Sequence, residues 1–152
     1  MNEVIRSPEW MDAAEWIANN SDYGDLVTHD WLWEKFQITK PKYGKQEDFD
    51  KADFEYMRCI AGLCQYLLEE HKLAIQNVRG QGYRVVPPKE QIDVARRQAK
   101  TELHKSVRRY AQHLEHIRYD ELEQHQQQQR DDEAAKLSQM RQMMRRQLSN
   151  SK

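Results

Sequence analysis

Hydrophobic residues recur at helical spacing in two short stretches near the N-terminus. The first predicted helix begins at Ser7, a capping residue, with Pro8 in its first position, and ends near Asn19 or Asn20. Its apolar face comprises Trp10, Met11, Ala14, Trp16 and Ile17. A turn and a very short strand at 26–27 follow. Thr28 then caps a second helix, whose apolar residues are Trp31, Leu32, Trp33 and Phe36.

A longer apolar stripe predicts a third helix from about Asp48 to His71, after a loop that Pro41 and Gly44 interrupt. The predicted stripe comprises Phe49, Ala52, Met57, Ile60, Ala61, Cys64, Leu67 and Leu68. The predicted outward positions are Lys51, Glu55, Arg58, Gln65, Tyr66 and Glu69. This helix is the strongest helical signal in the first half of the chain.

Two β-prone runs, 73–78 and 83–86, flank a glycine-containing tip at 79–82 and predict a β-hairpin that Pro87 and Pro88 end. The mainly α fold therefore carries one small β-hairpin, and we assign residues 1–87 to one domain. From residue 89 onward the chain lacks Pro and Gly and favours helix, so residues 88–152 form a helical arm. The stretch 123–133 is polar and leaves open whether the arm is one long helix or two helices interrupted there.

The arm contains five apolar residues at alternating spacings of four and three, which is the seam of a coiled coil. They are Leu103, Val107, Tyr110, Leu114 and Ile117. We expect this seam to join two subunits into a homodimer or a higher homo-oligomer. The alternative is that it folds back on its own domain.

The order helix, short strand, helix, loop, helix, hairpin resembles the winged helix-turn-helix topology. The hairpin resembles the wing of OmpR-type response-regulator effector domains, with Arg79, Gly80, Gly82 and Tyr83 at the places of a basic, glycine-rich tip and a core-packing aromatic residue. The resemblance implies a DNA-binding domain and is compatible with a small phage- or plasmid-type regulator. The chain departs from the pattern in its long, acidic third helix.

Charge is distributed unevenly along the chain. Residues 1–87 contain 10 Lys and Arg against 15 Asp and Glu, a net charge of −5, whereas residues 88–152 contain 14 against 10, a net charge of +4. The arm's positive charge is concentrated between Arg96 and Arg109. A net charge of −1 overall argues against indiscriminate coating of nucleic acid.

The predicted function is double-stranded DNA binding by a dimeric transcriptional regulator or DNA-organising factor. Candidate contacts come from the wing, the loop before the third helix, that helix, and the root of the arm. These residues are Arg79, Gln81 and Arg84; Lys40, Lys42 and Lys45; Lys51 and Arg58; and Arg96, Arg97 and Lys100. The alternative is an adaptor or inhibitor that binds a host or replication protein, favoured if Trp10, Trp31 or Trp33 is exposed.

Other classes of function receive little support. No nucleophile motif, phosphate loop or carboxylate pair indicates an enzyme, and no cofactor is expected. His113 and His116 lack further ligands at metal-site spacing, so no metal is expected. Cys59 and Cys64 lie in an apolar pattern and fit free thiols in a reducing cytoplasm. No segment is apolar enough for a membrane span.

Overall fold

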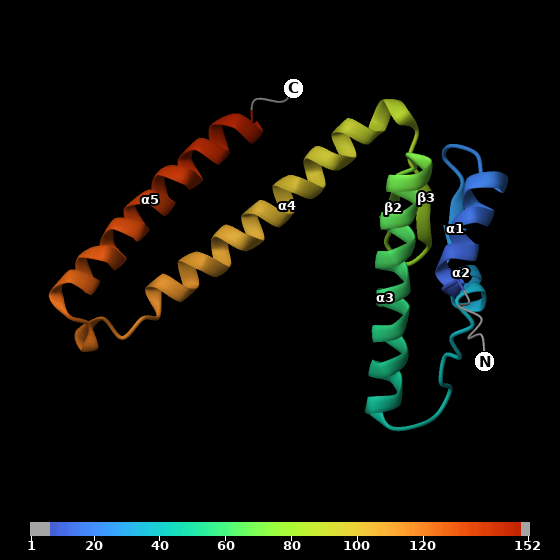
Figure 1. Cartoon of the computed structure of the whole chain (residues 1–152), viewed down its shortest axis with the longest axis horizontal. Coiled ribbons are helices and arrows are strands. Elements are labelled where there is room, and N and C mark those ends of the chain that lie inside the picture. Colours follow the sequence, from blue (N-terminus) through green and yellow to red (C-terminus); the bar gives the residue numbers. More distant parts are fainter. Residues whose placement is uncertain (1–6, 150–152) are drawn as a thin grey trace, which may run out of the picture. The chain divides into compact units, whose positions relative to one another are not determined.

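The computed structural model describes residues 7–149 and divides the chain into two compact units, with the boundary between Ile92 and Asp93. The described chain is mainly helical and contains one small antiparallel sheet (Figure 1). The first unit consists of α1 (Glu9–Asn20), β1 (Leu26–Thr28), α2 (His29–Lys35), α3 (Gln46–His71), β2 (Ile75–Val78) and β3 (Gly82–Val85). This order confirms the predicted elements of the first half of the chain, including the hairpin.

The three strands are joined through β3, because β1 and β2 both pair with it antiparallel in the order β1-β3-β2. Tyr83 therefore stands opposite Val27 on one side and Asn77 on the other. Gly82 has a positive φ of 153°, and a Cβ there would lie 2.0 Å from the carbonyl oxygen of Val27. Only glycine allows β1 to approach β3 this closely.

The core of this unit lies where α1, α2 and α3 meet the sheet. Its most deeply buried side chains are Ile17, Leu32, Leu63, Leu67, Val85 and Val86. The indole of Trp10 packs over Gly62, where a Cβ would come within 2.7 Å of the ring. The glycine at position 62 of α3 therefore leaves room for Trp10 where α1 crosses α3.

The predicted apolar stripe of α3 is confirmed only in part, since Ile60 and Leu67 are buried as predicted. The structure buries Tyr56, Cys59 and Leu63, which the prediction left out, whereas Met57 and Leu68 of the predicted stripe are exposed. Apolar residues occur all around this helix, so several stripes fit the helical spacing equally well. The contacts with α1 and α2 decide which of them is buried.

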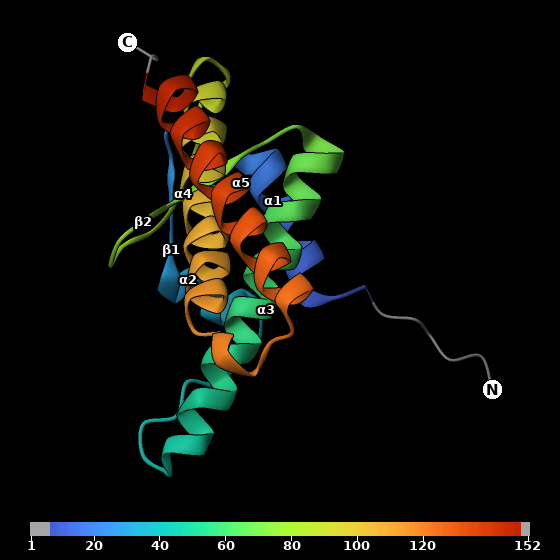
Figure 2. The same ribbon diagram turned by 90° about the vertical axis from the view of Figure 1, so that its left-hand side faces the viewer.

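The second unit contains the rest of α4 (Pro88–Glu115), a 3-10 turn η1 (Tyr119–Glu121) and α5 (Gln124–Ser149). The two helices run antiparallel side by side (Figures 1 and 2) and bury Val107, Ala111 and Leu114 against Leu137. The arm is therefore a helical hairpin within one chain.

The break between α4 and α5 precedes the polar stretch 123–133, which is where the sequence allows an interruption of the arm. Residues 126–129 are helical, because glutamine side chains satisfy the backbone of the turn. Gln126 Oε1 accepts a hydrogen bond from the Glu123 amide at 3.1 Å, and Gln127 Nε2 donates to the Tyr119 carbonyl at 3.1 Å. The glutamines thus begin α5 instead of interrupting a helix.

Candidate nucleic-acid interface

The tip of the β2–β3 hairpin is a tight turn that presents Arg79 and Gln81 to solvent. The Gln81 amide donates to the Val78 carbonyl at 3.0 Å, and Gly80 has a φ of 74°. The Gln81 carbonyl accepts a hydrogen bond from the amide of His29 at 3.2 Å. The tip, which extends outward in Figure 2, is thereby tied to the first residue of α2.

An aromatic cluster beside the tip connects β3, α2 and α3. The ring of Tyr83 meets the edge of His29 at 5.7 Å between centroids, and His29 Nδ1 lies 2.7 Å from the Tyr56 hydroxyl. Trp33 stacks on Tyr56 at 4.4 Å. Burial raises the pKa of both tyrosine hydroxyls, so both keep their protons at neutral pH. The cluster fixes the hairpin relative to the second and third helices.

Sequence reasoning anticipated only the Tyr83 member of this cluster, through the family resemblance. His29 and Tyr56 were missed because they lie 27 residues apart and neither belongs to a local motif. The signal that could have found them is the run of aromatic residues just after His29. The helical pattern alone treated those aromatic residues as ordinary core positions of the second helix.

Arg84 does not project from the hairpin as expected. Its Nη2 donates to Glu90 Oε2 at 2.6 Å, and the side chain is only 29% exposed. Arg84 lies on the central strand, opposite Leu26 and Gln76, rather than at the tip. Its role is therefore to hold the base of the hairpin to the start of α4.

The lysines of the loop between α2 and α3, which the sequence names as candidate DNA contacts, are exposed. Lys40 Nζ lies 5.5 Å from the centre of the Trp33 ring, which orders that end of the loop. Lys45 precedes α3, where its amide donates to Asp48 Oδ2 at 3.1 Å and its carbonyl accepts from the Asp48 amide. Within residues 7–149, the ammonium groups of Lys40, Lys42 and Lys45 form no ion pair.

The outward face of α3 is not uniformly basic. Lys51 is exposed, but the guanidinium of Arg58 is paired with Glu55, and this hydrogen bond lowers the pKa of the Glu55 carboxyl. Phe54 and Met57 are 73% and 57% exposed beside these charges. The face is a mixture of acidic and apolar groups, which suits phosphate contact poorly.

At the root of the arm, Arg96 pairs with Asp93 at 3.5 Å, Arg97 Nε lies 3.4 Å from the Asp93 carbonyl, and Lys100 is exposed. The five predicted seam residues divide into two groups. Val107 and Leu114 are buried within the α4–α5 hairpin. The exposed ones are Leu103 and Tyr110 of α4 and Ile117 just beyond its end, at intervals of seven residues.

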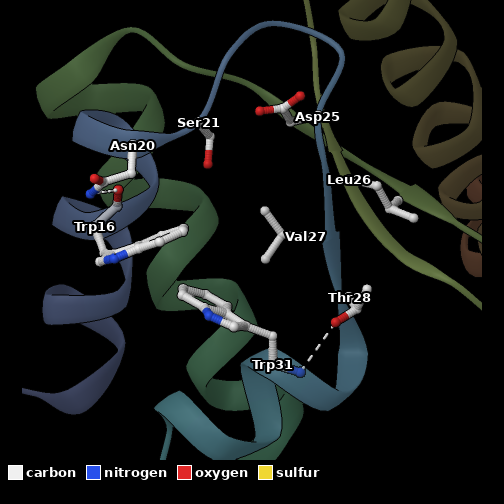
Figure 3. A pocket seen from close by; sticks show the side chains of 8 residues that line it. All are labelled: Trp16, Asn20, Ser21, Asp25, Leu26, Val27, Thr28 and Trp31. Carbon is white, nitrogen blue, oxygen red and sulfur yellow. Dashed lines mark hydrogen bonds between the residues drawn. The ribbon is translucent and has the colours of Figure 1, made fainter.

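A shallow hollow of about 290 Å³ lies between α1, β1 and α2 (Figure 3). Trp16 and Trp31 point toward one another across it, with ring centroids 4.9 Å apart, and Lys35 Nζ lies 5.5 Å from the Trp31 ring. Trp16 is 44% exposed, whereas the tryptophans named in advance as candidate anchors (Trp10, Trp31 and Trp33) are half-buried. Among the four tryptophans, the exposed one is therefore Trp16 and none of the three candidate anchors.

Other kinds of site find little support in the part of the chain that the structure describes. Residues 7–149 contain no group of three His, Cys, Asp or Glu side chains placed to hold a metal ion. No described helix combines the length and apolar character of a membrane span. Cys59 and Cys64 are free, and burial raises the pKa of the Cys64 thiol to about 11. Comparison with protein-family models, curated proteins and solved structures found no match for this chain.

Proposed function

We propose that the first unit is a winged helix-turn-helix domain that binds double-stranded DNA. Support comes from the element order α1, β1, α2, α3, β2, β3 and from the strand order β1-β3-β2, which are those of a winged helix. The β2–β3 hairpin is then the wing, and α2 with α3 is the helix-turn-helix. On this proposal the protein is a transcriptional regulator or a DNA-organising factor.

The observation that carries the proposal is the construction of the wing tip. Arg79 is an exposed cation on a turn whose backbone is bonded to the first residue of α2. A guanidinium held on a narrow, fixed ribbon suits a phosphate row or a minor groove. Lys42 and Lys45 supply further exposed positive charge just before α3. Gln81 adds an exposed amide beside Arg79.

Binding through this unit depends on few cations, because its outward α3 face is acidic and apolar. Lys51 is the unpaired cation of that face among the described residues, and Arg58 is shared with Glu55. We therefore assign the phosphate contacts mainly to the wing and the loop. Pairing of two copies through Leu103, Tyr110 and Ile117 would let two such modules engage two half-sites.

The test is a fluorescence-anisotropy titration of labelled duplex DNA across a range of salt concentrations. Arg79→Gln should weaken binding and lower the slope of log affinity against log salt by about 0.9, the value for one lost phosphate contact. Lys89→Gln is the matched control, since it removes one exposed charge near the base of the hairpin, at the opposite end from the tip. No duplex binding at low salt, or equal effects of the two substitutions, would refute the proposal.

A second candidate function is binding to another protein, as an adaptor or inhibitor. It is favoured by the outward face of α3, where Phe54, Met57 and Leu68 are all more than half exposed. Exposed apolar side chains of this size on one helix face are typical of interaction surfaces. A protein that binds no duplex at low salt, yet folds normally, would support this function over DNA binding.

A further inference from the structure

The helical hairpin of the second unit separates its charges into two halves. Its open half, defined as residues 96–109 of α4 and 138–149 of α5, contains nine Lys and Arg and one acidic residue, Glu102. Its turn half, residues 110–137, contains three Lys and Arg and seven Asp and Glu. The separation is invisible along the linear sequence, because the open half is assembled from two segments about thirty residues apart.

The return of α5 brings cations from both helices to the same groove. Leu137 packs against α4, and Arg141 and Arg145 follow it one and two turns later on the same side of α5. With His104 and Arg108 of α4 they line a groove of about 320 Å³, in which Val107 and Met144 supply the apolar lining. An adjoining hollow shares Arg141 and Arg145 and continues toward Leu137.

Among the described residues, the groove's arginines form no ion pair, and the acidic residue nearest to them in the lining is Glu115 of the adjoining hollow. The ion pairs within the hairpin are local and use its acidic residues elsewhere, as in Lys105–Glu102, Arg118–Glu121, Arg130–Asp131 and Lys136–Glu133. Over residues 7–149, no ion pair involves Arg108, Arg141 or Arg145. Three unpaired guanidinium groups in one groove repel one another, and a bound anion would reverse that repulsion.

We propose that this groove binds the phosphate backbone of nucleic acid as a second contact, separate from the wing. The inference rests on the proposed function, DNA binding, and adds a site on the arm. Guanidinium groups bind phosphate oxygens in a bidentate manner, and arginines on both walls surround a narrow chain of phosphates. Cations that face one another across a groove suit such a chain better than the flat surface of a lipid membrane.

The experiment uses the full-length chain and the same labelled duplex, titrated over a range of salt. The double variant Arg141→Gln/Arg145→Gln should lower the salt slope by about 1.8, the value for two phosphate contacts, and should weaken binding at least tenfold. The control variant Arg118→Gln/Lys136→Gln removes the same charge from the turn half and should change affinity less than twofold. The variant Arg141→Lys/Arg145→Lys keeps the charge and should retain most of the slope.

The outcomes separate this inference from the proposed function of the wing. If Arg79→Gln lowers the slope and the groove variant does not, the groove inference is refuted while wing binding stands. If the groove variant lowers the slope and Arg79→Gln does not, the groove inference stands and the wing assignment fails. Equal losses in the groove variant and the turn-half control would refute the groove, because net charge alone would account for them.

The stability and the lipid binding of the groove variant provide two further tests. Helicity and thermal unfolding by circular dichroism should show the Gln double variant at least as stable as the parent, since it removes like charges. A less stable arm would contradict the proposed repulsion.

Vesicles containing phosphatidylserine supply a lipid anion as an alternative ligand for the groove. Loss of vesicle binding with unchanged duplex binding in the groove variant would overturn the nucleic-acid assignment.

Discussion

Substitution of Gly82 by alanine should detach the wing from β1. A Cβ at this position would lie 2.0 Å from the Val27 carbonyl oxygen and 2.8 Å from Thr28 Cα, both backbone atoms. Neither can move aside as a side chain can, so β1 must shift away from β3. The shift would disturb the pairing of Val27 with Tyr83 and the adjacent bond from the His29 amide to the Gln81 carbonyl.

The expected cost has separable parts. The positive φ costs an alanine about 1–2 kcal/mol. Crowding a well-packed backbone, with the loss of one backbone hydrogen bond included, costs about 2–3 kcal/mol more. The total of about 3–5 kcal/mol is a large share of the stability of a small domain, about 5–15 kcal/mol. At Gly80, with a φ of 74° and nothing within 4 Å of a Cβ, only the backbone term applies.

Urea denaturation followed by tryptophan fluorescence is the suitable assay, because all four tryptophans lie in the first unit and report on it alone. Gly82→Ala should lower its free energy of unfolding by about 3–5 kcal/mol and Gly80→Ala by about 1–2 kcal/mol. Duplex affinity of the folded fraction should fall further for Gly82→Ala. Equal destabilisation by the two substitutions would show that the close approach of β1 is not what requires glycine at Gly82.

Two further predictions concern the arm and the contact between α1 and α3. Leu114→Ala should destabilise the helical hairpin by about 2–5 kcal/mol by circular dichroism, whereas Leu103→Ala should change it by less than about 0.5 kcal/mol at concentrations low enough to keep the chain monomeric. If two copies pair through Leu103, the loss with Leu103→Ala should grow as the protein concentration rises, and a loss that is small at every concentration would contradict that pairing. Hydrogen bonds to Tyr66 and His71 lower the pKa of Glu15 below its ordinary value of 4.5. The contribution of the Glu15 carboxylate to stability is therefore present above pH 4.5 and is lost as the pH falls through the lowered pKa. In urea denaturation, Glu15→Gln should lower the free energy of unfolding at pH 7 and lower it less in acid. A loss of stability that stays constant with pH would contradict this reasoning.

The local chemistry of the chain was sufficient to predict the hairpin and its tip. Gly80 and Gly82 have positive φ values, and the β-prone runs on either side of them pair in register. Such features depend on residues close in sequence, for which propensity and turn type are reliable guides. The cap at Thr28, whose side chain accepts a hydrogen bond from the Trp31 amide, was predicted for the same reason.

The buried face of α3 could not be predicted, because a distant element decides it. Tyr66 was placed outward, yet its hydroxyl donates to Glu15 of α1 at 2.6 Å. Phe54 and Met57 are large and apolar, yet within the described residues they stay exposed. Helical spacing identifies possible stripes, and only the packing of α1 and α2 selects among them.

The candidate site was predicted in part for a related reason. Arg79 and the loop lysines are exposed because they lie on a turn and in a loop, and their role as DNA contacts stays a prediction. Arg84 was misjudged because its partner, Glu90, follows the hairpin in the next helix. Arg141 and Arg145 were missed because their neighbours, His104 and Arg108, are brought to them by a chain reversal that contains no Gly or Pro.

The distribution of charge bears on how affinity and specificity would be divided between the two units. A helix that enters a major groove is flanked by phosphates, and Asp50 and Asp53 of α3 would face them at a cost. Few cations of the first unit offset this cost, so its binding would be weak on non-specific DNA and sensitive to the shape that the wing meets. On the proposal above, the cationic groove of the arm would add affinity without reading sequence, since phosphates carry no base information. Loss of the groove should therefore weaken binding to all duplexes alike, whereas loss of Arg79 should reduce discrimination between them.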